Sequence, residues 1–197
     1  MYPIHMKFAV AGVSGAGKTT LLRLLEQIAP NVTLHIKDTT RSPRTGEAAE
    51  NSRDLSFLSP EQFEANRLSG AYDIVYSRYG HLYGMRRDQL LRAMQEKELH
   101  FAIISDIPSI KQFKYMYRDA RAIYIHTDPR DIPDHMQQRE GIEKSERLAR
   151  ITRAYHEFID NNDVFDHVVL NFWEKENALR QLRNILHSYA RTGAAGL

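Results

Sequence analysis

The apolar residues of this chain fall into short, nearly continuous runs separated by longer stretches in which they recur every three or four residues. The short runs are typical of strands covered on both faces, and the recurring pattern is typical of amphipathic helices. The predicted strands are residues 7–11, 100–104, 122–126 and 167–170. The predicted helices are residues 20–25, 88–98, 110–117, 145–159 and 174–189. Strands alternating with helices predict an α/β fold with a parallel sheet that binds ligands at the carboxyl ends of its strands.

The pattern changes in the middle of the chain. Residues 32–36 and 72–79 alternate between apolar and polar side chains as half-buried strands do, and residues 55–58 predict another short strand. The polar residues 37–46 predict a loop, and Ser59, Pro60 and Gln62 predict a capped helix start. On helix 88–98 we expect Leu90, Leu91 and Met94 to form the buried face. The residues from the polar loop to about Gly84 are expected to form a small mixed subdomain inserted between elements of the core.

The segment after the first predicted strand carries the clearest chemical signal. Residues 12–19 read Gly-Val-Ser-Gly-Ala-Gly-Lys-Thr and match the phosphate-binding loop pattern Gly-x-x-x-x-Gly-Lys-Ser/Thr between a strand and a helix. In such a loop the backbone N–H groups surround an anion, Lys18 reaches the β- and γ-phosphates, and the Thr19 hydroxyl is a Mg²⁺ ligand. The residues expected to bind ATP are Gly12, Ser14, Gly15, Ala16, Gly17, Lys18, Thr19 and Thr20.

Composition narrows the class of protein. With 197 residues, 42% of them hydrophobic and 26% charged, the chain is long enough for one substantial core but not comfortably for two. It has no cysteine, which excludes disulfides, thiolate catalysis and cysteine-bound zinc. The net charge of +2 gives no reason to expect a nucleic-acid partner, and no apolar run is long enough to span a membrane. We expect a soluble, cytoplasmic protein with neither a nucleic-acid nor a membrane partner.

Further motifs follow the phosphate-binding loop in a fixed order. They are Thr39-Thr40-Arg41-x-Pro43-Arg44-x-Gly46-Glu47, Leu58-Ser59-x-Glu61-x-Phe63, Gly80-x-x-Tyr83-Gly84, Arg139-x-Gly141 before an arginine-bearing helix, and the strand Phe165–Asn171. In this order and spacing they resemble the guanylate kinase family over nearly the whole chain. The loop alone would suit many ATPases, and the Thr-Thr-Arg-x-Pro-Arg motif is what narrows the resemblance.

The resemblance implies a P-loop kinase fold of three layers, with a parallel five-stranded sheet, an inserted acceptor-binding subdomain and a helical lid. It implies one domain over residues 1–197. Its parts are a core at 6–37 and 88–190, an acceptor-binding subdomain at 38–87 and a lid region at 128–150. The implied ligands are ATP, Mg²⁺ and a small phosphorylated acceptor.

The resemblance also assigns roles to single residues. Arg41, Arg44 and Tyr83 are expected to hold the acceptor phosphate, since guanidinium groups grip phosphate oxygens in pairs. Asp106 aligns with a family aspartate at the acceptor site, with the alternative that it simply caps the next helix. Lys37 replaces a family serine that binds the acceptor phosphate, and we include it among the acceptor-binding residues.

For the transfer step, Lys18 and one or more of the lid arginines Arg139, Arg147 and Arg150 are the expected catalytic residues. The transition state of phosphoryl transfer needs mainly positioning and positive charge. The attacking group is an ionised phosphate oxygen, so no general base is required.

The departures from the family concern guanine. The glutamate that reads the base aligns with Ile74, and the hydroxyl residue after the Tyr-Gly pair is Met85, neither of which can form the required hydrogen bonds. Asp73 is adjacent but would need a β-bulge to face the same way. We therefore expect an ATP-dependent kinase for a nucleoside monophosphate-like acceptor, with GMP itself disfavoured by the loss of these base-reading groups. The alternatives are a sugar-phosphate kinase resembling ribose 1,5-bisphosphate kinase and a non-catalytic binding module, which the intact Lys18 and Thr19 disfavour.

Overall fold

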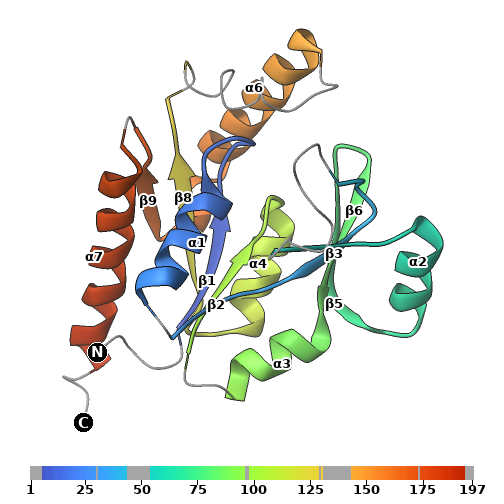
Figure 1. Ribbon diagram of the computed structural model, residues 1–197, viewed down its shortest axis with the longest axis horizontal. Helices are drawn as coiled ribbons and strands as arrows, with labels where there is room; N and C mark the ends of the chain where they lie inside the picture. The colour runs from blue at the N-terminus through green and yellow to red at the C-terminus, as the bar shows by residue number, and fades with distance from the viewer. Residues whose placement is uncertain are drawn as a thin grey trace.

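A parallel five-stranded sheet forms the centre of the molecule (Figure 1). The computed structural model describes residues 6–29, 31–43, 54–95, 98–128, 130, 143–172 and 174–193. Neighbouring strands of the sheet lie in the order β2-β7-β1-β8-β9, and every pairing is parallel. The strands are β1 (Lys7–Ala11), β2 (Val32–Leu34), β7 (Leu99–Ile103), β8 (Arg121–His126) and β9 (His167–Leu170). The α/β fold with a parallel five-stranded sheet is thus confirmed.

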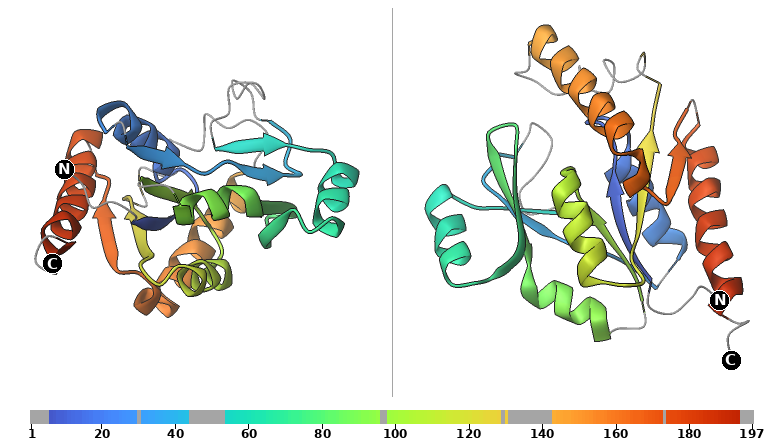
Figure 2. Two further views of the ribbon diagram at one scale, coloured as in Figure 1. Left: turned by 90° about the horizontal axis from the view of Figure 1, so that it is seen from below. Right: turned by 180° about the vertical axis from the view of Figure 1, so that it is seen from behind.

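Helices cover the two faces of this sheet and make three layers (Figure 2). On one face, α1 (Lys18–Ile28) and α7 (Lys175–Gly193) bury Leu21, Leu25, Leu182 and Leu186 in one apolar cluster with β1 and β7. On the other, α4 (Ile107–Met116) buries Ile110 and Phe113. The short 3₁₀ helix η2 (Asn162–Val164) adds Val164 to the cluster of α4, whereas helix α6 (Lys144–Asp160) packs Ile151 and Ala154 in the cluster of α1 and α7. All residues of β1 and β7 are buried, which is why these strands read as continuous apolar runs.

A second, four-stranded sheet stands beside the first (Figure 1). Its order is β4-β3-β6-β5, formed by β3 (Lys37–Thr39), β4 (Leu55–Phe57), β5 (Tyr72–Arg78) and β6 (His81–Arg86). Helix α2 (Pro60–Leu68) begins with the predicted capping box, in which Ser59 and Gln62 exchange side-chain-to-backbone hydrogen bonds. Helix α3 (Arg87–Gln95) leads back to the main sheet.

Two local predictions are wrong. Residues 37–39 are not loop but the strand β3, because they pair with β4 on one side and β6 on the other. Helix α3 buries Leu90 and Ala93, whereas Leu91 and Met94 are about half exposed. The helix packs along a narrow stripe only, where Tyr117 donates a hydrogen bond to the Leu90 carbonyl at 2.7 Å.

The strand β5 contains an irregularity at a position that matters for the site. Its register with β6 shifts between Tyr72 and Ile74, so Asp73 lies in a bulge. Two of the expected lid residues, Arg139 and Gly141, lie outside the described residues. In the part of the chain that is described, no helix has the length and apolarity to cross a membrane.

Candidate active site

The phosphate-binding loop has a backbone shape that only glycine adopts easily. Between β1 and α1, Gly12, Gly15 and Gly17 have φ angles of 146°, 91° and 80°. A Cβ atom on Gly12 would also lie 2.4 Å from the carbonyl oxygen of Ile125. The Lys18 ammonium donates to the carbonyls of Gly12 at 2.9 Å and Val13 at 2.8 Å, so it lies folded across its own loop. The loop therefore presents a lysine and a helix N-terminus to an anion.

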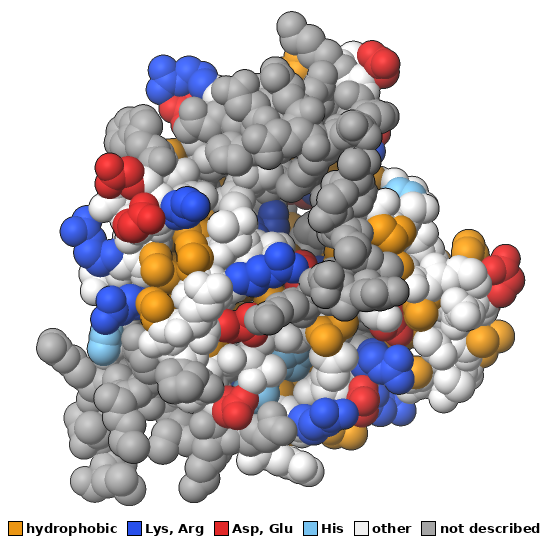
Figure 3. All heavy atoms as spheres, viewed as in Figure 1, with side chains coloured by type: hydrophobic (Ala, Val, Ile, Leu, Met, Phe, Trp, Pro, Cys, Tyr) orange, Lys and Arg blue, Asp and Glu red, His pale blue; other side chains and the backbone are white. Residues whose placement is uncertain are grey.

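A cavity of about 160 Å³ opens in front of this loop. In the space-filling view, Lys and Arg side chains lie in and beside the hollow at the middle of the face (Figure 3). The described residues that line the cavity include five cationic side chains and a single carboxylate, that of Asp54. The cations are Lys18, Lys37, Arg41, Arg78 and Arg150. Such a cavity suits a ligand that carries several negative charges.

The small sheet supplies three of the expected acceptor residues to this cavity: Lys37, Arg41 and Tyr83. Lys37 is 4% exposed, and its ammonium donates to the Ile103 carbonyl and lies 5.6 Å from the centre of the Tyr83 ring. The Tyr83 ring stacks on Tyr76 at 5.2 Å between ring centres. The register of β3 against β6, which pairs Lys37 with Met85, is what brings Lys37 beside Tyr83.

Arg41 is held just after β3. It is 8% exposed, its backbone N–H donates to the Thr39 hydroxyl at 3.1 Å, and its guanidinium lies 5.2 Å from the centre of the Phe57 ring. The second arginine expected at the acceptor phosphate, Arg44, lies outside the described residues.

Asp106 is placed as a helix cap. Its carboxylate accepts hydrogen bonds from the Ser109 N–H at 2.9 Å and the Ser109 hydroxyl at 2.6 Å at the start of α4. It is not among the described residues that line the cavity, where the preceding residue, Ser105, stands instead. The geometry corresponds to the capping alternative.

Among the expected lid arginines, Arg150 on α6 lines the cavity. Its guanidinium pairs with Glu146 and lies 4.3 Å from the centre of the Tyr79 ring. The side chain of Arg147 lies outside the described residues, as does Arg139.

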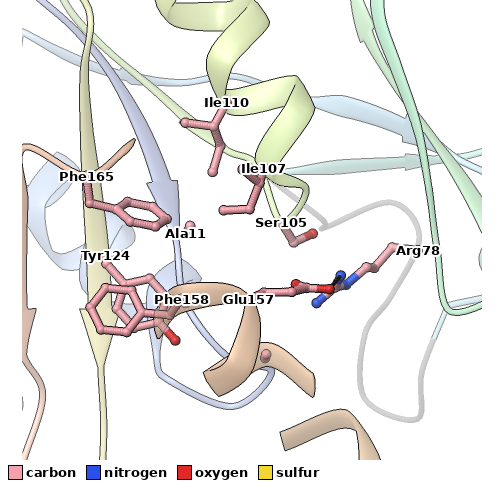
Figure 4. Close-up of a pocket in the computed structure, with 11 residues that line it drawn as sticks. Ala11, Arg78, Ser105, Ile107, Ile110, Tyr124, Glu157, Phe158 and Phe165 are labelled. Carbon is pink, nitrogen blue, oxygen red and sulfur yellow. Dashed lines mark hydrogen bonds and ion pairs between the residues drawn. The ribbon is translucent and has the colours of Figure 1, made fainter. Parts of the chain in front are cut away.

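Two charged residues that line this cavity, Arg78 and Asp54, were not predicted from the sequence. Arg78 ends β5 and is paired with Glu157 of α6, beside a smaller cavity of about 20 Å³ that contacts the rings of Tyr124, Phe158 and Phe165 (Figure 4). Burial raises the pKa of Tyr124, whose hydroxyl has no hydrogen-bond partner among the described residues. Neither Arg78 nor Asp54 belongs to a motif, and no local signal distinguishes them from surface charges.

The Thr19 hydroxyl lies at the end of the phosphate-binding loop and donates a hydrogen bond to the Asp54 carboxylate at 3.1 Å, which leaves the threonine oxygen lone pairs available to a metal. Among the described residues there is no cluster of three acidic or histidine side chains that would bind a metal by itself. A Mg²⁺ ion bound mainly through nucleotide phosphates needs only one or two protein ligands, and prefers oxygen. The residues present thus fit a Mg²⁺ ion that arrives with ATP.

The guanine-reading positions are closed off in this structure. Ile74 is fully buried and Met85 is 1% exposed, and both pack in the apolar cluster between the two sheets. The bulge at Asp73 does not bring its carboxylate to the cavity, because the carboxylate pairs with Arg87 at 2.7 Å. None of these three residues lines the cavity.

A profile of the guanylate kinase family matches residues 6–189. The chain belongs to the guanylate kinase family. It is 29% identical over 182 residues to a guanylate kinase of Nitrosomonas europaea, covering 92% of this chain and 88% of the relative. It is 32% identical over 141 residues to one of Thermosynechococcus vestitus, covering 72% of each chain.

Solved structures support the same fold. The crystal structure of guanylate kinase from Anaplasma phagocytophilum matches with a TM-score of 0.71 and 22% identity, covering 95% of this chain and 87% of that one. Shikimate kinase from Bacteroides thetaiotaomicron matches less closely, with a TM-score of 0.56 and 15% identity, covering 92% and 98%. At these identities the likeness concerns the fold alone. Membership of this family makes the chain a P-loop nucleotide-binding protein. It does not identify the acceptor.

Proposed function

We propose that this protein transfers the γ-phosphoryl group of ATP to the phosphate of a small, nucleoside monophosphate-like acceptor other than GMP. The observation that carries the proposal is a single cavity. It is lined by Lys18 and Thr19 of the phosphate-binding loop and by Lys37, Arg41 and Tyr83 of the small sheet. Donor and acceptor phosphates bound by these two groups of residues would face each other directly, which transfer between them requires.

We assign each residue a role that its place in the cavity supports. Lys18 turns from its loop carbonyls to the β- and γ-phosphates, and Thr19 helps to hold the metal. Arg41 and Tyr83 hold the acceptor phosphate, and Arg150 adds positive charge from the side of α6. When bound, Mg²⁺ neutralises charge on the phosphate oxygens, which is the main demand of this transition state.

The burial of two apolar residues, Ile74 and Met85, disfavours GMP as the acceptor. A base reader must place a polar group at the ligand, and Ile74 and Met85 are apolar and packed away from the cavity. A site that loses the groups with which it hydrogen-bonds a substrate discriminates less by about 10⁴-fold. The nearby carboxylate of Asp73 is engaged by Arg87.

One observation favours a second candidate, a sugar-phosphate kinase resembling ribose 1,5-bisphosphate kinase. Lys37 adds a buried positive charge where the family has a neutral serine, and its hydrogen bonds go to the Ile103 carbonyl and the Tyr76 phenol. A buried cation held by neutral groups is stabilised by an anion on the ligand. An acceptor with two phosphates and no base would satisfy this cavity.

Coupled measurement of ADP release over a panel of acceptors tests the proposal. The panel contains GMP, AMP, CMP, UMP, dTMP, ribose 5-phosphate and ribose 1,5-bisphosphate, each with Mg·ATP. We expect turnover of a nucleoside monophosphate other than GMP. Turnover of ribose bisphosphate alone would move the assignment to the second candidate.

Controls separate catalysis from contamination. Lys18→Ala removes the charge that the loop offers to phosphates and is expected to abolish turnover and Mg·ATP binding. Lys111→Ala, which removes an exposed lysine of α4, is the matched control and keeps both. A wild-type protein that binds no ATP by calorimetry would instead be a non-catalytic binding module.

A further inference from the structure

Asp54 joins the small sheet to the phosphate-binding loop. It directly precedes β4, and its backbone carbonyl accepts a hydrogen bond from the Lys37 N–H at 3.1 Å. Its side chain reaches α1, where one carboxylate oxygen accepts a hydrogen bond from the Thr19 hydroxyl at 3.1 Å. The other oxygen lies 3.5 Å from the guanidinium of Arg23.

The carboxylate is poorly placed to serve stability alone. Its side chain is 10% exposed, whereas that of its ionic partner Arg23 is 42% exposed. Withdrawing a carboxylate from water costs free energy, and a long ionic contact to a half-exposed guanidinium offsets little of that cost. Asp54 is nevertheless the one carboxylate among the described lining residues of the cavity.

The hydrogen bond to Thr19 has a chemical consequence. A threonine hydroxyl binds a metal through an oxygen lone pair, so its proton must point elsewhere. Asp54 accepts a hydrogen bond from this hydroxyl and thereby fixes its rotation, with the oxygen lone pairs turned away from the carboxylate. Groups that orient a metal ligand in this way tune metal affinity without contacting the metal.

We propose that Asp54 is a positioning residue for the metal of this site, acting through the Thr19 hydroxyl. The proposal rests on the proposed function, because it presumes that Mg·ATP binds at the phosphate-binding loop. It also assigns the small sheet a part in metal binding, since Asp54 is held by β3 and Thr19 by α1.

The test is calorimetric and does not depend on turnover. Dissociation constants are measured for Mg·ATP and for ATP in excess EDTA, and their ratio reports how much the metal strengthens binding. We expect Asp54→Ala to lower this ratio about 10- to 100-fold, as loss of a group that orients a metal ligand does. Asp54→Asn, whose amide oxygen still accepts the Thr19 proton, is expected to recover most of it.

A double-mutant cycle distinguishes positioning from packing. If Asp54 acts through Thr19, then Asp54→Ala in a Thr19→Ala background changes the ratio no further. Arg23→Gln, which removes the ionic partner but spares the Thr19 contact, is the matched control and leaves the ratio unchanged. Asp54→Ser, too short to reach Thr19, replaces Asp54→Ala if that variant does not fold.

The outcomes are separable. An unchanged ratio in Asp54→Ala, no recovery in Asp54→Asn, or additive effects in the cycle would each overturn the positioning role and leave the kinase proposal standing. A wild-type protein that binds no ATP, with or without metal, would overturn the proposed function and this inference with it.

Discussion

The Arg78 guanidinium donates a hydrogen bond to the Glu157 carboxylate at 2.6 Å, and this pair ties the end of β5 to helix α6 (Figure 4). The pair lies beside the cavity, with the Arg78 side chain 14% exposed. The neighbouring Tyr79, at a φ of 51°, places its ring 4.9 Å from the Arg78 guanidinium and 4.3 Å from that of Arg150. Tyr79, at the tip of the β5–β6 hairpin, thus contacts both Arg78 and Arg150, two arginines that line the cavity.

Glu157→Gln is expected to lower the free energy of unfolding by about 1–3 kcal/mol, because it leaves the buried Arg78 charge without its anion. Denaturant unfolding measures this loss. Asp160→Asn, which removes an exposed carboxylate of the same helix, is the matched control and should change stability little. Equal stability of the two variants would show that the pair contributes nothing.

Arg150→Ala is expected to lower kcat by roughly 10³-fold, since a guanidinium placed at the transferring group stabilises the transition state by that order. Arg153→Ala, one turn away and exposed, is the control and should retain kcat. The steady-state constants are measured with the acceptor that the panel identifies. A normal kcat in Arg150→Ala would exclude Arg150 from the transfer step.

Lys37→Met is expected to raise the KM of the acceptor about 10- to 100-fold, the cost of one charge-assisted hydrogen bond. The KM of ATP should not change. The same substitution should raise the melting temperature, because it removes a buried cation whose hydrogen bonds go to neutral groups. Lys111→Met is the surface control. A lower melting temperature with an unchanged acceptor KM would assign Lys37 to folding instead.

The protein is expected to lose stability in mild acid through a buried histidine. His35, 3% exposed and 3.1 Å from the His100 ring nitrogen, has its pKa lowered to about 3 by burial and by the charge of His100. The unfolded chain therefore takes up a proton near pH 6.5 that the folded protein refuses until about pH 3. The free energy of unfolding falls as the pH falls through this window, by at most about 1.4 kcal/mol per pH unit for this group.

Denaturant unfolding between pH 7 and pH 4 measures that slope. His35→Asn should flatten it, and His156→Gln, at an exposed site on α6, should leave it unchanged. Equal pH dependence of the unfolding free energy in the wild type, His35→Asn and His156→Gln would mean that His35 does not control acid stability.

The continuous apolar runs at β1, β7 and β8 predicted the main sheet correctly, because strands covered on both faces leave a signal within a few residues. Residues 37–39 gave no such signal. Their strand exists only through pairing with β4 and β6, which come later in the chain. In the same way, the buried stripe of α3 was set by what packs against it, which exposed Leu91 and Met94.

The site also has one part that local sequence predicts and another that depends on tertiary contacts. The sequence by itself determined the phosphate-binding loop, since Gly12, Gly15, Gly17, Lys18 and Thr19 are consecutive or nearly so and their roles follow from backbone shape. Only the tertiary structure decided that Asp54 meets Thr19 and that Arg78 meets Glu157. Charged residues far apart in the chain carry no mark of their partner, because the distance between them is fixed by sheet register and helix packing.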